Sequence, residues 1–290
     1  MSITRDRLIS PLLLAIAFFS TTALFIIGLF IFVEGLPIML KVGLRKFILS
    51  SDWLPLEGQF GIFPMIVGSL FVGAGTMVVA VPLGVGCAVY LSEFASKRVV
   101  TIVKPPIELL FAIPSVVYGF IGIIFIVPFV REHLGGQGHG FCILTACIVL
   151  GVRVLPVIVG MSIDALQAVP KAYRDGSLAL GATTWQTTTM VTLRAARSGI
   201  LASVILGMGN AIGETMAVIM VIGNAVVMPD SPLDSVRTLT SNIALEMGYA
   251  AGDHRQALFA TGVVLFVIIM FLNALMRLVV RNRAVRKWDH

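Results

Sequence analysis

The sequence predicts an all-α, polytopic membrane protein with six transmembrane helices. Of its 290 residues, 58% are hydrophobic and only 12% are charged, whereas a soluble domain carries about 25% charged residues. Charge-free runs of 20 residues or more recur along the chain, and about 20 apolar residues in a helix cross the hydrocarbon core of a bilayer. The composition therefore excludes a soluble domain and a disordered chain.

Charge-free runs give the limits of four expected spans, residues 8–33, 58–92, 109–130 and 256–276. The run at 133–152 begins in a Gly-rich polar stretch, so we expect its span at about 141–162, with Arg153 inside it, and the span at 198–229 is interrupted by Glu214. We expect the first to be retained as a helix, because its apolar run exceeds the 7–15 residues of a secretory signal and no small-residue cleavage site follows it. Pro82 and Pro114 are expected to kink the second and third spans, since neighbouring helices can satisfy the backbone groups that proline frees.

Lysine and arginine are distributed unequally between the loops. With the N-terminus inside, fourteen lie on the cytoplasmic side, within residues 5–7, 97–104, 171–197 and 277–287, and six lie outside. The positive-inside rule therefore places both termini in the cytoplasm. The net charge of +6 is spread over these loops, whereas nucleic-acid binding requires basic residues gathered on one face.

The chain shows no motif for catalysis or for cofactor binding. Its three cysteines lie in apolar stretches without a Cys-x-x-Cys or Cys/His spacing, which excludes disulfide and metal sites. The nearest approach to a nucleotide-binding P-loop, from Gly176 to Gly181, lacks the lysine that holds phosphates. No pair of catalytic side chains falls within the spans. We therefore expect a chain that is not an enzyme and binds no metal or nucleotide.

The connection at about 163–197 has its own composition. Pro170 favours a helix start, 171–180 can form about three turns, Gly181 ends them, and Thr183 can cap a second helix. We expect a helix–turn–helix hairpin at the membrane surface. A plain tether between spans is the alternative, but exposed apolar side chains on a hairpin usually meet a partner. The apolar side chains concerned are Leu178, Leu180, Trp185 and Met190.

The same connection carries a spaced motif. It reads Asp175-Gly176-Ser177, three residues, Gly181, nine residues and then Val191-Thr192-Leu193. This spacing resembles the cytoplasmic EAA motif of ABC-importer permeases, written E-A-A-x3-G-x9-I-x-L-P, with Arg194 at the place of the final proline. The resemblance implies a hairpin that docks on an ATPase subunit and couples it to the spans. The coupling residues that it implies are Asp175, Gly176, Ser177, Gly181, Trp185, Val191 and Leu193.

Longer segments resemble one group within these permeases. They are residues 81–93, 107–122, 180–187 and 213–224, the last of which begins Gly-Glu-Thr-Met-Ala-Val and ends Ile-Gly-Asn. They are similar to the phosphate ABC-importer permeases of the PstC type. The resemblance implies a MetI-like permease core and the translocation of inorganic phosphate across the bacterial inner membrane. We expect residues 1–57 to hold the first span and an outward loop, and residues 58–290 to form the permease core with the coupling hairpin.

The resemblance also implies partners. They are a second permease of the PstA type, two ATPase subunits of the PstB type that bind ATP and Mg, and a phosphate-binding receptor of the PstS type. The outward loops at 34–59 and 228–255 are the expected docking surface for the receptor, unless they are only solvated. The acidic residues that could pair with it are Asp230, Asp234, Glu246 and Asp253.

Two ionisable residues lie within the spans, Arg153 and Glu214. Such residues are expensive in a membrane and indicate a functional site by default. Asn210 precedes Glu214 by one helical turn and Thr215 follows it directly, so the four residues are the predicted substrate pathway. A carboxylate can accept the proton of hydrogen phosphate, which fully ionised sulfate does not offer. The alternative is that Glu214 pairs with Arg153 and only fixes helix packing.

Two other functions remain open from the residues. An importer of another oxyanion, such as sulfate or molybdate, would share the same architecture. An ion-coupled secondary carrier would need no ATPase, but it usually shows internal repeats and more intramembrane ionisable residues. The hairpin at 163–197 favours the ATP-driven importer, since the carrier leaves it unexplained.

Overall fold

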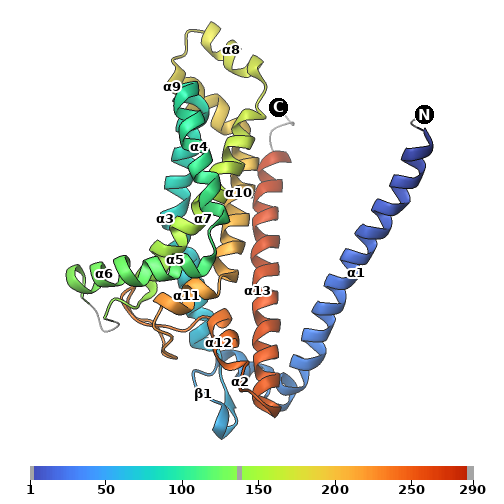
Figure 1. Cartoon of the computed structure of the whole chain (residues 1–290), viewed down its shortest axis with the longest axis vertical. Coiled ribbons are helices and arrows are strands. Elements are labelled where there is room, and N and C mark those ends of the chain that lie inside the picture. The colour runs from blue at the N-terminus through green and yellow to red at the C-terminus, as the bar shows by residue number, and fades with distance from the viewer. Residues whose placement is uncertain (1–2, 136–138, 286–290) are drawn as a thin grey trace.

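Long helices that run side by side give the molecule its axis (Figure 1). The computed structural model describes residues 3–135 and 139–285, so Arg286 and Lys287 of the basic tail lie outside it. The α-helices and strands are α1 (Ile3–Val42), α2 (Leu44–Leu49), β1 (Trp53–Leu54), β2 (Gln59–Phe60), α3 (Phe63–Val89), α4 (Lys97–Ala112), α5 (Ser115–Ile121), α6 (Val127–His133), α7 (Ile143–Gln167), α8 (Lys171–Ala179), α9 (Thr184–Gln186), α10 (Leu193–Gly213), α11 (Met216–Val221), α12 (Leu239–Glu246) and α13 (Gly252–Val285). Helices α3, α7, α10 and α13 form the bundle, with α8 at one end and the β1–β2 hairpin at the other.

Among the described residues, six helical segments are long and apolar enough to cross a membrane, which confirms the predicted number. They are Pro11–Val42, Phe63–Phe94, Ser115–His133, Ile143–Gln167, Thr184–Gly213 and Gly252–Ala274. Two spans differ most from the expected ones, the first and the fifth. The first span continues through Glu34 and Pro37 to Val42. The fifth begins at Thr184, inside the predicted hairpin, and ends at Gly213 rather than continuing through Glu214.

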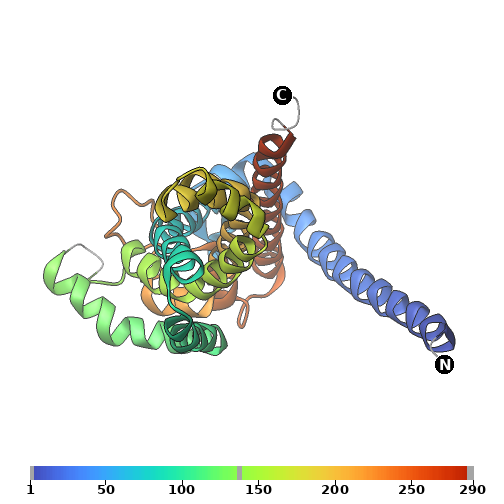
Figure 2. The ribbon, with the colours of Figure 1, turned by 90° about the horizontal axis from the view of Figure 1, so that it is seen from above.

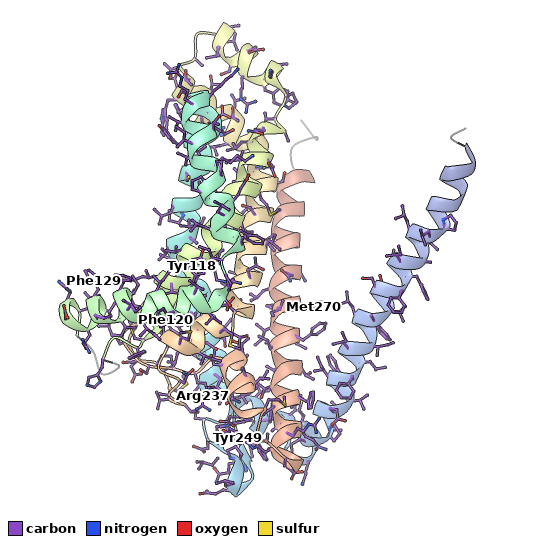
Figure 3. The ribbon with its side chains drawn as sticks, viewed as in Figure 1. Tyr118, Phe120, Phe129, Arg237, Tyr249 and Met270 are labelled. Atoms are coloured by element: carbon purple, nitrogen blue, oxygen red, sulfur yellow. The ribbon has the colours of Figure 1, made fainter. Side chains whose placement is uncertain are left out.

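The third span is bent far more than a kink at Pro114 implies. The backbone leaves the helix at Ile113 and Pro114, whose ψ angles are 127° and 142°. The Tyr118 hydroxyl donates to the carbonyl oxygen of Leu110 at 2.7 Å, so it satisfies an acceptor at the end of α4. Tyr118 lies at this corner (Figure 3). Helices α5 and α6 then run across the bundle (Figures 1 and 2). The expectation of one kinked membrane-spanning helix over 109–130 is therefore wrong, because two separate helical segments meet there at a sharp bend.

The centre of the bundle is α7, which packs against α3 and α10. The side chain of Ile158 in α7 is fully buried, and it packs against a glycine of each neighbouring helix. A Cβ atom on Gly84 of α3 would come within 2.7 Å of the Ile158 side chain, and one on Gly207 of α10 within 3.0 Å. The missing side chains therefore let both helices approach α7 closely.

Helix α1 stands apart from the bundle over most of its length (Figures 1 and 2). It contacts α13 through two edge-to-face aromatic pairs, Phe30 with Phe259 at 5.6 Å and Phe32 with Phe266 at 6.1 Å between ring centroids. The remaining face of α1 is apolar and exposed. The start of α1 and the end of α13 lie at the same end of the molecule as α8.

The opposite end is held together by the carboxylate of Glu246, which is buried at the end of α12. Its two oxygens accept from Arg237 Nη1 at 2.6 Å, His254 Nε2 at 2.7 Å and Trp53 Nε1 at 2.9 Å. These partners come from the loop before α12, from α13 and from β1, which pairs antiparallel with β2. Figure 3 shows Arg237 at this end, beside α12. The expectation that Glu246 faces a receptor is therefore wrong, because four segments converge to bury it.

Removing this carboxylate should destabilise the fold strongly. We expect Glu246→Ala to lower the free energy of unfolding by about 3–5 kcal/mol, because it leaves the buried guanidinium of Arg237 without its counter-charge. Denaturant titration in detergent micelles measures the change. The control is Glu108→Ala, which breaks an exposed pair with Lys104 at 3.7 Å and should cost less than about 1 kcal/mol. Equal losses in the two variants would contradict this account of the Glu246 cluster.

Candidate functional site

The hairpin after α7 forms as the sequence predicts. Pro170 precedes α8, and Gly181 has a φ of +84°, a left-handed conformation that ends the first arm. Thr183 and Gln186 then cap the second arm reciprocally: the Thr183 hydroxyl accepts from the Gln186 backbone, and the Gln186 side chain accepts from the Thr183 backbone. The helix–turn–helix structure is confirmed, and its coupling role stays a prediction.

The second arm differs from the expected short helix. It runs from α9 through a π-helical segment, Thr187–Thr192, directly into α10. Arg194 has the backbone N–H that a proline at this place would lack, so the helix need not end there. Val191 and Leu193 are consequently half-buried within one continuous helix.

The predicted coupling residues divide into two groups. Asp175, Gly176, Gly181 and Trp185 are exposed. Ser177 instead holds the two arms together, because its hydroxyl lies 3.0 Å from that of Thr187. Around the exposed group lies an apolar surface with no cover in the described part of the chain. It consists of Tyr173, Leu178, Leu180, Trp185 and Met190, and exposed apolar surfaces of this kind occur where a protein contacts another protein or a membrane.

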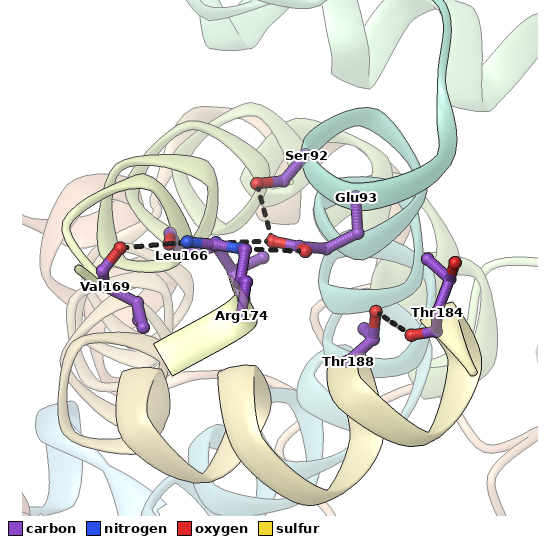
Figure 4. Close-up of polar contacts among 7 residues, drawn as sticks. All are labelled: Ser92, Glu93, Leu166, Val169, Arg174, Thr184 and Thr188. Carbon is purple, nitrogen blue, oxygen red and sulfur yellow. Dashed lines mark hydrogen bonds and ion pairs between the residues drawn. The ribbon is translucent and has the colours of Figure 1, made fainter. Parts of the chain in front are cut away.

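One residue of the hairpin that the sequence did not single out is Arg174, next to Asp175. Its guanidinium donates to the Glu93 carboxylate through Nε at 3.1 Å and Nη2 at 2.7 Å. It also donates to the carbonyl oxygens of Leu166 and Val169, both at 2.9 Å (Figure 4). The hydrogen bond to Glu93 raises the pKa of Arg174 above its ordinary value. A signal was present in the sequence, because Glu93 is the acid that ends a long charge-free run.

The other predicted site lies at a break in the fifth span. Helix α10 ends at Gly213, the backbone of Glu214 is extended with ψ 133°, and α11 begins at Met216. The Glu214 side chain accepts from the backbone N–H of Ala217 at 3.3 Å, and its backbone carbonyl accepts from the Thr240 hydroxyl at 3.1 Å. The break is therefore stabilised by side chains that take over the lost helical hydrogen bonds.

Arg153 of α7 reaches this break. Its Nη2 lies 2.8 Å from Glu214 Oε2, and the Glu214 side chain is only 7% exposed while that of Arg153 is 28% exposed. Thr215 donates to the Gly213 carbonyl at 3.3 Å, and Asn210 is half-buried one turn earlier. The structure thus brings Arg153, Glu214 and Thr215 together at a broken helix. A guanidinium has five N–H donors, so Arg153 can hold Glu214 and still donate to an anion on its exposed side.

The acidic residues that were expected to meet a receptor are mostly engaged within the chain. Asp234 accepts from the backbone N–H groups of Asp230 and Ser231 at 2.8 and 2.7 Å. Asp253 pairs with Lys41 at the exposed surface. Together with buried Glu246, these contacts leave Asp230 as the exposed acid of the set whose carboxylate has no contact among the described residues.

Comparison with known proteins places these features in context. Residues 80–285 match the family described as binding-protein-dependent transport system inner membrane component. The chain is 40% identical over 265 residues to the probable ABC transporter permease protein YqgH of Bacillus subtilis, covering 89% of this chain and 85% of that one. It is 33% identical over 289 residues to the phosphate transport system permease protein PstC of Haemophilus influenzae, covering 91% and 92%.

Two solved structures share the fold. A bacterial ABC transporter involved in the import of the acidic polysaccharide alginate aligns with a TM-score of 0.64 at 18% identity, over 95% of this chain and 96% of that one. An inward-facing structure of the MetNI methionine ABC transporter aligns with a TM-score of 0.56 at 21% identity, over 77% and 94%. The expected MetI-like permease core is thereby confirmed.

The left-handed turn at Gly181 can be tested by hydrogen exchange. We expect Gly181→Ala to cost roughly 1–2 kcal/mol at this position, so that amides of residues 171–182 exchange about tenfold faster. Gly176→Ala is the control. It lies inside α8 with open space around its Cβ position and should favour the helix by up to about 1 kcal/mol, slowing exchange. Unchanged exchange in Gly181→Ala would show that the turn does not depend on glycine at 181.

Proposed function

The chain belongs to the binding-protein-dependent transport system inner membrane components, and from this membership we propose that it is the permease subunit of an ATP-driven importer of inorganic phosphate. The observation that carries the proposal is the likeness to several PstC phosphate permeases, at 32–34% identity over about 80–90% of the chain. Membership in this family argues against the ion-coupled secondary carrier.

We propose that the α8 end of the bundle faces the cytoplasm. The start of α1, the end of α13 and the hairpin all lie at this end, and it carries the larger share of lysine and arginine. Two PstB-type ATPase subunits would bind ATP and Mg, because this sequence offers no P-loop. One of them would dock on the exposed apolar surface of the hairpin. A PstA-type permease would complete the membrane part, and a PstS-type receptor would deliver phosphate at the opposite end.

For the substrate pathway we propose the break in the fifth span. Broken helices commonly form transport sites, since their free ends can bind ions. Arg153 supplies positive charge for the anion, and Glu214 can accept the hydrogen bond that hydrogen phosphate donates and sulfate lacks. Thr215 and Asn210 add hydroxyl and amide groups beside them. The contact with Arg153 orients the Glu214 carboxylate, so pairing and substrate recognition are compatible roles.

Uptake of labelled phosphate tests the proposed function. It is measured in a bacterial strain that lacks this chain, with and without the chain restored, and in competition with unlabelled sulfate and molybdate. We expect uptake only in the restored strain, unaffected by either competitor. Equal uptake in both strains overturns the assignment, and strong competition by sulfate or molybdate would assign the chain to that oxyanion instead.

Glu214→Gln separates recognition from packing. Because one hydrogen bond to a charged group contributes about 1.5–3 kcal/mol, we expect the preference for phosphate over sulfate to fall by roughly tenfold or more. Uptake of each anion, normalised to the amount of assembled protein, gives the preference. Glu246→Gln is the matched control, since it alters an equally buried and paired carboxylate whose partners are Arg237, His254 and Trp53 and not residues of the break. The same preference in both variants and the wild type would leave Glu214 with a packing role alone.

A further inference from the structure

Arg174 joins three elements at the α8 end of the bundle. It is part of α8, its partner Glu93 belongs to the π-helical segment Tyr90–Phe94 that extends α3, and its other acceptors are carbonyl oxygens at the end of α7. Figure 4 shows the guanidinium between these segments. The contact therefore links α8 with two helices of the bundle at once.

The link is strong and geometrically fixed. The two N–H groups meet both oxygens of one carboxylate, an arrangement that adds orientation to a charge-assisted hydrogen bond. The side chains are shielded, with Glu93 7% and Arg174 21% exposed, so solvent and salt screen them little. The carbonyl oxygens of Leu166 and Val169 add the partial negative charge of a helix C-terminus. Arg174 is thus held by one carboxylate and two carbonyls.

The bundle side of this link leads to the break in the fifth span. Helix α7 carries Leu166 near its end and Arg153 thirteen residues earlier, which corresponds to about 20 Å along the helix axis. Arg153 forms the ion pair with Glu214. A displacement of α8 that moves Arg174 therefore acts on the same helix that carries Arg153. Glu93 itself lies in the π-helical segment at the end of α3, and such segments are often found at functional positions. From there its carboxylate meets Arg174 of α8.

We propose that Arg174 and Glu93 form the positioning contact through which movement of α8 reaches α3 and α7, so that ATP hydrolysis on the partner stays coupled to translocation. The proposal rests on the proposed function and deepens it. Neither residue touches the cargo or the nucleotide. Breaking the pair leaves the docking surface of the hairpin in place but loosens its connection to the spans.

The test uses the complete transporter with its receptor in proteoliposomes, and it measures ATP hydrolysis and phosphate import in the same preparation. Glu93→Gln removes the charge while Arg174 keeps its carbonyl acceptors, so the hairpin stays folded. We expect the phosphate imported per ATP hydrolysed to fall roughly fivefold or more. The control is Glu108→Gln on α4, which breaks an exposed pair and should leave the ratio unchanged.

A double-mutant cycle identifies the pair itself. If the two side chains act through each other, Arg174→Gln combined with Glu93→Gln lowers the ratio no more than the larger single effect. Multiplied effects would overturn the proposal, as would a Glu93→Gln transporter that loses hydrolysis and import in equal proportion, since a merely structural role predicts that result. If the wild-type transporter hydrolyses ATP but imports no phosphate, the proposed function fails instead, which is a distinct outcome.

Discussion

Every backbone polar group inside a membrane must find a partner within the protein, and this constraint decides how the bundle can be interrupted. Among the described residues, the helix is interrupted at Pro114 and at Glu214, inside the third and fifth spans that the sequence predicts. At Pro114 the Tyr118 hydroxyl takes up a carbonyl oxygen. At Glu214 the carboxylate receives an N–H of α11, and the Thr240 hydroxyl donates to the freed backbone carbonyl. The second break uses a carboxylate as acceptor, and Arg153 supplies its counter-charge. The proposed cargo site follows from this requirement.

The two ends of the bundle use the same type of contact for different purposes. At one end the Glu246 carboxylate accepts hydrogen bonds from Arg237, His254 and Trp53 and so holds the loops against the bundle. At the other, Arg174 and Glu93 connect a largely exposed helix to the bundle. The first contact joins loops and helices at one end, whereas the second joins the bundle to the hairpin that we propose binds the ATPase partner.

Much of the fold could be predicted from local sequence. Charge-free runs gave the six spans, and Pro170, Gly181 and Thr183 gave the hairpin, because each acts on the backbone within a few residues. The direction of α5 and α6 after Pro114 could not be predicted in this way, since it depends on packing against α7 and α11. The burial of Glu246 and the pairing of Arg174 were missed for a related reason. Their partners lie far away in the sequence, and an acid in a polar loop looks solvated until those segments are placed together.

The central claim is that phosphate binds at the break in the fifth span, and site-directed labelling tests it most directly. Thr215→Cys is introduced into a chain whose three native cysteines are replaced by serine or alanine, and its reaction with a small thiol reagent is followed in the assembled transporter. Phosphate is predicted to slow the labelling while sulfate does not, and a cysteine at exposed Leu56 should react at the same rate with either anion. Labelling at 215 that is indifferent to phosphate would contradict the account.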